Sequence, residues 1–178
     1  MIKLKRGMDI PIAGSPRQEI DTAPPARSVG LVGPDYIGMK PTMAVQEGDR
    51  VAAGQLLFTD KKTDGVRYTA PAGGTVAAIN RGARRVLQSV VIDVEGDEAV
   101  DFGRLDADAA RALGAEDIRA RLVESGQWTA LRTRPYSKVP AIDSQPRAIF
   151  VNAMDSHPLA PDPTVFIGEQ AEAFALGQ

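Results

Sequence analysis

The 178-residue sequence contains no cysteine, one histidine and one tryptophan. The lack of cysteine excludes disulfides, thiolate nucleophiles and cysteine-ligated zinc or iron–sulfur centres. The formal net charge is −2, and because nucleic-acid-binding domains usually carry a basic footprint, we expect no nucleic-acid partner. No apolar run approaches the ~18 residues of a bilayer-spanning helix, and none follows the basic residues 1–7. We therefore expect neither a transmembrane segment nor a signal peptide.

Residues 45–57 carry the most informative pattern, V-x-x-G-D-x-V-x-x-G-Q-x-L. It is typical of one half of the flattened β-fold of biotinyl and lipoyl carrier domains. Gly48 and Gly54 stand where tight reversals require positive φ, which a Cβ makes costly. A related element returns at residues 79–94, where Ile79 and a glycine precede a second strand. Two related halves predict one small sandwich, with Val51 and Leu57 in its core.

The rest of the sequence changes character twice. Short branched segments punctuated by glycine and proline fill the first hundred residues, which is all-β spacing. An alanine-rich stretch then predicts two short helices, at 106–113 and 115–125, with Gly126 as the residue after the second. We expect a biotinyl/lipoyl-like barrel-sandwich hybrid at 1–102, a helical and basic-loop connector at 103–140, and an incomplete α/β domain at 141–178.

Two signals support the α/β assignment of the last segment. Residues 148–151 form a continuous apolar run, which is typical of a strand covered on both faces in a parallel sheet. Asp162 and Pro163 have the residue types of an N-cap and a first helical position. Ile167, Ala171 and Phe174 then fall on one helical face. One strand and one helix cannot complete such a domain, so we expect a truncated one.

Lys61 follows Asp60 in a hairpin between the two halves, and Asp-Lys is the dipeptide at which carrier domains are modified. A modified lysine sits at the apex of a tight hairpin, whereas here the strongest turn former is Asp64-Gly65. We therefore expect Lys61 to be unmodified, with a carrier domain modified at Lys61 as the alternative. Arg81, Arg84 and Arg85 are interpreted as a solvated face that balances nearby acids. No complete catalytic motif occurs, so we expect no catalytic, cofactor-binding or metal-binding residues.

The sequence resembles the A-subunit family of the sodium-translocating NADH:quinone reductase. The resemblance runs in order through nearly the whole chain, and its most specific elements are D-Y-I-G-M-K-P-T-M at 35–43, D-K-K at 60–62, I-N-R-G at 79–82 and P-Y-S-K at 135–138. The resemblance implies a protein on the cytoplasmic face of the bacterial inner membrane. That protein contacts the membrane through membrane subunits of the same complex, chiefly the one that holds the quinone site.

The resemblance also implies a function. The complex uses NADH, flavin and sodium, and it reduces ubiquinone, while this chain alone is expected to catalyse nothing. Its expected role is docking, together with a quinone-proximal surface made by two loops, at 33–40 and 132–138. A purely structural scaffold without a ligand is a further alternative. The residues expected at that surface are Tyr36, Ile37, Met39, Lys40, Arg132, Arg134, Tyr136 and Lys138.

Overall fold

The computed structural model describes residues 12–21, 24–155 and 157–176, which divide into two units. The sandwich unit is Pro25–Gln145. The terminal unit comprises the described parts of Met1–Pro24 and Pro146–Gln178.

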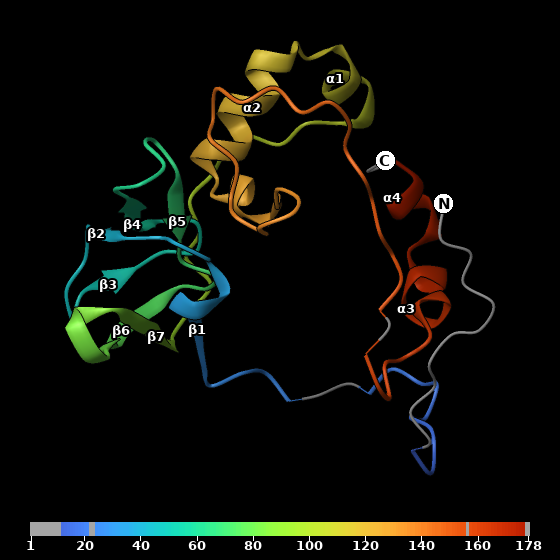
Figure 1. Ribbon diagram of the computed structural model, residues 1–178, viewed down its shortest axis with the longest axis horizontal. Helices are drawn as coiled ribbons and strands as arrows, with labels where there is room; N and C mark the ends of the chain where they lie inside the picture. Colours follow the sequence, from blue (N-terminus) through green and yellow to red (C-terminus); the bar gives the residue numbers. More distant parts are fainter. Residues whose placement is uncertain (1–11, 22–23, 156, 177–178) are drawn as a thin grey trace. The chain divides into compact units, whose positions relative to one another are not determined.

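The sandwich unit consists of two antiparallel sheets (Figure 1). The larger sheet has the order β1 (Ser28–Val32), β7 (Leu87–Val94), β6 (Gly74–Arg81) and β3 (Arg50–Val51). The smaller has the order β2 (Pro41–Met43), β4 (Leu56–Asp60) and β5 (Arg67–Thr69). This arrangement confirms the prediction of a mainly β region followed by short helices.

The core lies between these sheets because alternate residues of each strand point inward. Val90 and Ile92 of β7 are fully buried, and their neighbours on the strand are more exposed. Val51 of β3 and Leu57 of β4 are buried as well, which confirms both predicted core positions. Phe58 stacks on Tyr68 at 4.6 Å between ring centroids. Buried residues of both sheets belong to one apolar cluster.

The turns of the two halves differ in how they reverse the chain. Gly48 and Gly54 have φ of +90° and +82°, as the pattern predicted. In the second half Gly82 has φ −94°, and the left-handed residues of the short turn η2 (Ala83–Arg85) are Arg84 and Arg85. A non-glycine residue in that region costs on the order of 1–3 kcal/mol. The two halves thus both contain strands, but the residues with positive φ in their turns are glycines in the first half and arginines in the second.

Two helices and a short 3₁₀ turn follow the strands: α1 (Ala107–Ala112), α2 (Ala115–Glu124) and η3 (Gln127–Ala130). Asp106 caps α1, since its carboxylate accepts a hydrogen bond from the Ala109 N–H at 2.7 Å. Gly126 follows α2 with φ +81°, which is the left-handed conformation common after a helix C-terminus. Both predicted helices are confirmed.

The terminal unit contains α3 (Pro163–Glu169) and α4 (Ala171–Leu176). The prediction of the helix start is confirmed, because Asp162 accepts from the Thr164 N–H and Pro163 is the first helical residue. The chain turns at Gln170, so Ile167 and Phe174 belong to different helices.

The predicted buried strand at 148–151 is wrong for this chain. Ile149 is 71% exposed and Phe150 87% exposed, and neither lies in a strand. A strand is held by hydrogen bonds to a neighbour, and the described residues of the terminal unit include no strand that could pair with it.

Candidate functional site

The 33–40 loop and the 132–138 loop lie against each other on the sandwich unit. The Arg132 guanidinium carbon is 5.2 Å from the centroid of the Tyr36 ring, which is a cation–π distance. A Cβ placed on Gly38 would lie 3.7 Å from Cε of Lys138. We call this region the two-loop surface. Residues about a hundred positions apart in the sequence thus meet at one place.

Trp128 fixes the second loop in position. Its side chain is buried in the sandwich core, and its indole N–H donates to the Pro140 carbonyl at 2.9 Å. Within the loop, Thr133 N–H donates to the Lys138 carbonyl at 2.8 Å, which closes the loop on itself. Because Trp128 sits in η3, it positions Arg132 beside Tyr36. No sequence pattern assigns Trp128 a role, although a lone tryptophan next to a basic loop is a usable signal for an anchor.

A cavity of about 250 Å³ lies behind the two-loop surface. Of the predicted residues, Tyr36, Ile37, Met39 and Lys138 line it. Arg132 lies beside it over Tyr36. Lys40, Arg134 and Tyr136 are exposed and do not line it. The structure therefore separates the predicted set into an inner group around the cavity and an outer group on the surface.

Two tyrosines form the aromatic wall of this cavity. Tyr36 packs on Tyr68 at 4.7 Å between centroids, with the rings nearly perpendicular. Burial raises the pKa of Tyr68, and the nearby Asp60 carboxylate raises it further. Burial also raises the pKa of Tyr36, and the positive charge of Arg132 partly offsets this rise. Both phenols therefore remain neutral donors at physiological pH, and among the described residues the buried Tyr68 hydroxyl has no hydrogen-bond partner.

Asp60 ties the 33–40 loop to the β4–β5 hairpin. The residue is 6% exposed, and its Oδ1 accepts from the backbone N–H of Lys40 at 2.8 Å and of Lys62 at 2.9 Å. Two backbone donors compensate the burial of this carboxylate. In the sequence, Asp60 is notable only as the neighbour of a carrier-like lysine, so its structural role is not predicted.

Lys61 itself is exposed, and its backbone N–H donates to the Lys40 carbonyl. The turn of the hairpin is centred on Asp64-Gly65, as predicted, because Val66 N–H donates to the Thr63 carbonyl and Gly65 has φ +78°. A Cβ on Gly65 would lie 2.7 Å from Cδ1 of Ile142. Another segment of the sandwich unit therefore packs against the hairpin apex.

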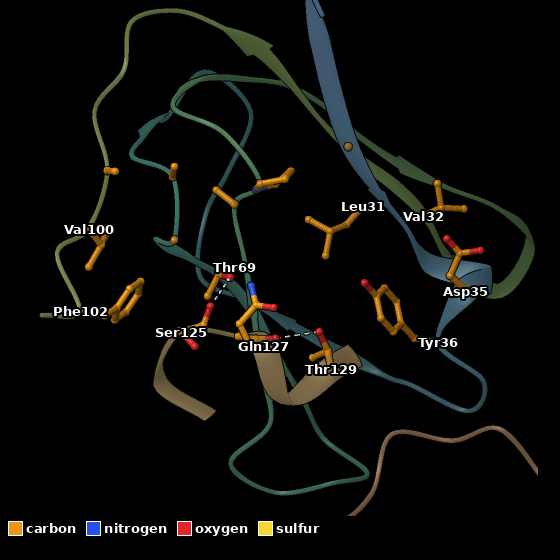
Figure 2. Close-up of a pocket in the computed structure, with 17 residues that line it drawn as sticks. Leu31, Val32, Asp35, Tyr36, Thr69, Val100, Phe102, Ser125, Gln127 and Thr129 are labelled. Carbon is orange, nitrogen blue, oxygen red and sulfur yellow. Dashed lines mark hydrogen bonds between the residues drawn. The ribbon is translucent and has the colours of Figure 1, made fainter. Parts of the chain in front are cut away.

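A larger and shallower groove of about 680 Å³ lies beside β1 (Figure 2). Leu31, Thr69 and Phe102 line it, and Tyr36 does too, so Tyr36 contributes to both hollows. Thr69 donates to the carbonyl of Ser125, the C-cap residue of α2, at 3.0 Å, which fastens the segment between α2 and η3 to β5 at the edge of the groove. This groove was not foreseen, because its lining residues come from separate stretches of sequence.

The residues that the structure describes offer neither a membrane-spanning helix nor a metal-binding cluster. No helix among them combines the length and apolar character that crossing a bilayer demands. Within the same residues, no cluster of three or more histidine or acidic side chains could hold a metal ion.

Comparison with protein-family models matches two regions. Residues 2–95 match the NqrA N-terminal barrel-sandwich hybrid domain, and residues 113–178 match the NqrA second alpha/beta domain. The fold class expected from the sequence, a barrel-sandwich hybrid followed by an α/β domain, is thereby confirmed.

Curated relatives cover almost the whole chain. The A subunit of the Na(+)-translocating NADH-quinone reductase from Saccharophagus degradans is 63% identical over 177 residues. The proteins of the same name from Pseudomonas aeruginosa and Neisseria meningitidis are 62% and 56% identical. Each match spans 99% of this chain and 40% of the relative. The chain therefore corresponds to less than half the length of these proteins.

Proposed function

Since this chain belongs to the NqrA family, the A subunits of Na(+)-translocating NADH-quinone reductases, we propose that it is a peripheral, non-catalytic part of a respiratory complex. In this proposal the complex oxidises NADH, reduces ubiquinone and exports sodium. The chain lies at the cytoplasmic face of the inner membrane, and the NADH, flavin and sodium that the complex uses are not bound by it. The contribution of this chain is docking, and the two-loop surface meets the membrane subunit that holds the quinone site.

The composition of the two-loop surface is the observation that carries this proposal. Tyr136 is 72% exposed and Ile37 is 53% exposed, and Arg134 and Lys40 are exposed near them in the sequence. Aromatic residues and arginine are enriched in protein–protein interfaces. The loops are also held by Asp60 and Trp128, so little conformational entropy is lost when a partner binds.

Direct quinone binding is the second candidate, and the cavity behind the loops favours it. Tyr36 and Met39 offer ring contacts, while Lys138 and the unpaired Tyr68 hydroxyl offer donors for carbonyl oxygens. Docking remains the better-supported role for two reasons. The cavity of about 250 Å³ is smaller than the roughly 300–1,000 Å³ of most ligand pockets. Arg132 also covers one face of the Tyr36 ring.

Assembly and quinone titration distinguish these roles. In the full-length protein produced with its membrane partners, the double variant Arg134→Ala/Tyr136→Ala is expected to weaken association at least about tenfold, since truncated aromatic and arginine anchors cost ~1–2 kcal/mol or more. Quinone affinity should be unchanged. Arg104→Ala, an exposed arginine outside both loops, is the control. Normal assembly of the double variant contradicts docking, and loss of quinone binding in Tyr36→Ala with normal assembly favours the second candidate.

The carrier alternative makes its own prediction. A lipoyl or biotinyl group on Lys61 adds a discrete mass, whereas our proposal expects the mass of the unmodified sequence. Support comes from the hairpin, whose apex lies at Asp64-Gly65 and contacts Ile142 rather than standing free. Intact mass spectrometry of protein from its native cells, with Lys61→Arg as the reference, decides between them. A stoichiometric adduct that disappears in the variant establishes the carrier function.

A further inference from the structure

The turn between β6 and β7 places two arginines in an unusual backbone conformation. Val86 N–H donates to the Ala83 carbonyl at 3.2 Å, and the two residues between them, Arg84 and Arg85, have φ of 54° and 62°. This is the geometry of a type I′ turn, for which asparagine and glycine are the favoured residues because both central φ values are positive. Asparagine followed by glycine would adopt this backbone conformation with less strain than two arginines. The reason for two arginines must therefore lie outside the turn itself.

The charges at this turn are concentrated and exposed. Arg81, Arg84 and Arg85, here called the arginine tip, are all exposed. Arg81 donates to the Arg85 carbonyl at 3.3 Å. Among the described residues, none of the three guanidinium groups forms an ion pair with a carboxylate. Val86, the next residue, is an apolar side chain that is 56% exposed. The tip therefore combines an exposed apolar residue with three arginines that form no ion pair with a carboxylate among the described residues.

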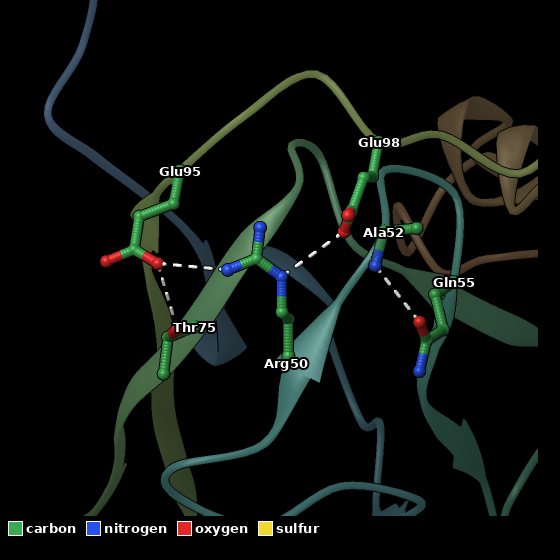
Figure 3. Close-up of polar contacts among 6 residues, drawn as sticks. All are labelled: Arg50, Ala52, Gln55, Thr75, Glu95 and Glu98. Atoms are coloured by element: carbon green, nitrogen blue, oxygen red, sulfur yellow. Dashed lines mark hydrogen bonds and ion pairs between the residues drawn. The ribbon is translucent and has the colours of Figure 1, made fainter.

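The opposite end of the same two-stranded ribbon is acidic. β7 begins after the arginine tip and ends before the turn that carries Glu95, Asp97, Glu98 and Asp101. Arg50 joins two of these acids, at 3.2 Å from Glu95 and 3.3 Å from Glu98 (Figure 3). The eight residues of β7 separate the two ends by roughly 24 Å, more than twice the Debye length of about 8–10 Å. The ribbon thus carries three arginines at one end, the arginine tip, and a mainly acidic turn at the other.

We propose that the arginine tip binds the surface of an anionic lipid bilayer directly and orients the sandwich unit with its acidic turn away from it. Arginine forms bidentate hydrogen bonds with phosphate oxygens, and an apolar side chain beside cations suits the boundary between headgroups and acyl chains. The tip is a narrow turn and none of its residues lines either cavity described above. It therefore fits a flat, mobile layer of phosphates better than a shaped protein partner. None of the three arginines belongs to the two-loop surface, although Gly33 at the start of the 33–40 loop packs against Leu87 beside the tip.

Vesicle co-sedimentation of the 178-residue chain tests this proposal. We expect binding to phosphatidylcholine vesicles that contain phosphatidylglycerol, weaker binding at high salt, and none to phosphatidylcholine alone. A basic residue near an anionic surface contributes about a fivefold change in partition coefficient. The triple variant Arg81→Gln/Arg84→Gln/Arg85→Gln should therefore bind on the order of a hundredfold more weakly.

A second variant separates lost binding from lost folding. Arg84→Asn with Arg85→Gly gives the turn its favoured residues, so its thermal midpoint should rise while its vesicle partition coefficient falls about 25-fold. The double variant Arg104→Gln/Arg111→Gln removes the same charge elsewhere and should bind as the wild type does. Three outcomes overturn the proposal: no binding by the wild type, an equal loss in the control, or unchanged binding by the Asn-Gly variant. Binding to polyglutamate but not to vesicles also overturns it, in favour of an acidic protein partner.

Discussion

The sandwich unit buries twelve apolar side chains, from Val51 to Val139, whereas the described residues of the terminal unit bury none. Local signals do not explain this difference, because both units have well-capped helices: Asp106 caps α1 and Asp162 caps α3. The units differ in whether their extended segments pair with a neighbouring strand. Every strand of the first unit has a partner, while the apolar run at 148–151 has none among the described residues. A capping residue can start a helix through local hydrogen bonds, but apolar side chains are buried only when another element packs against them.

The largest expected effect is on the sandwich core. Leu57→Ala should lower the free energy of unfolding by roughly 2–5 kcal/mol, because the side chain is fully buried and its removal leaves a cavity. Ile149→Ala is the matched change in the terminal unit and should cost less than about 0.5 kcal/mol, since Ile149 is exposed. Urea denaturation of both variants measures the two values. Similar values would show that the units do not differ in packing.

Two glycines sharpen the same contrast. Gly126→Ala should cost roughly 1–3 kcal/mol, because φ is +81° and the new Cβ would crowd Oγ1 of Thr69. Gly168→Ala should instead stabilise α3 by about 0.5–1 kcal/mol, because nothing lies within 4 Å of the new Cβ. Thermal unfolding reports the first change and far-ultraviolet circular dichroism the second. A tolerated Gly126→Ala would mean that η3 is not fastened closely to β5.

The helix-capping residues should contribute less to the free energy of unfolding than the core leucine and Gly126. Replacing Asp106 or Asp162 by alanine removes a carboxylate that accepts a helix N–H. For Asp106 the loss of such a cap should cost about 0.5–2 kcal/mol, and for the fully exposed Asp162 a fall in helix content is expected. The corresponding asparagine variants keep an acceptor and serve as controls. Helix content from circular dichroism should fall in both alanine variants and in neither asparagine variant. A loss confined to one unit would mean that the two caps are not equivalent.

Acid and alkali should act on different units. The raised pKa values of Tyr36 and Tyr68 mean that their contribution to stability is complete below about pH 10 and is lost as pH rises through the folded-state values. Hydrogen bonds from Thr164 lower the pKa of Asp162, so its contribution is present above about pH 4 and is lost as pH falls through the lowered value. Near-ultraviolet circular dichroism at high pH measures the alkaline effect on the tyrosines, and helix content at low pH measures the acid effect on α3. The Tyr68→Phe variant should reduce the alkaline effect, because it removes one of the two titrating phenols.

Features that depend on nearby residues were predictable from the sequence. Gly48, Gly54 and Gly126 were recognised from their place in turn and helix-end patterns, and all three have positive φ. The helix starts at Asp106 and Asp162 were recognised in the same way. The strand at 148–151 was not predicted correctly, because an apolar run specifies a tendency and the partner strand decides the outcome.

The candidate site was only partly predictable. The residue types of the two loops suggested a shared surface, and the loops do lie together, while the quinone-proximal and docking roles and the domain boundaries near 102 and 140 stay predictions. Tyr68 and Asp60 were missed because both resemble ordinary strand residues. Their importance comes from burial beside groups that are distant in sequence, which no local pattern records.

The two hydrogen bonds to Asp60 also have a consequence for how motion is detected. The amides of Lys40 and Lys62 belong to different loops but share one acceptor oxygen, so opening of that carboxylate exposes both to solvent at once. Their hydrogen–deuterium exchange rates should therefore rise and fall together. A fluorescent label on the β4–β5 hairpin would then detect opening of the 33–40 loop although the label does not contact that loop.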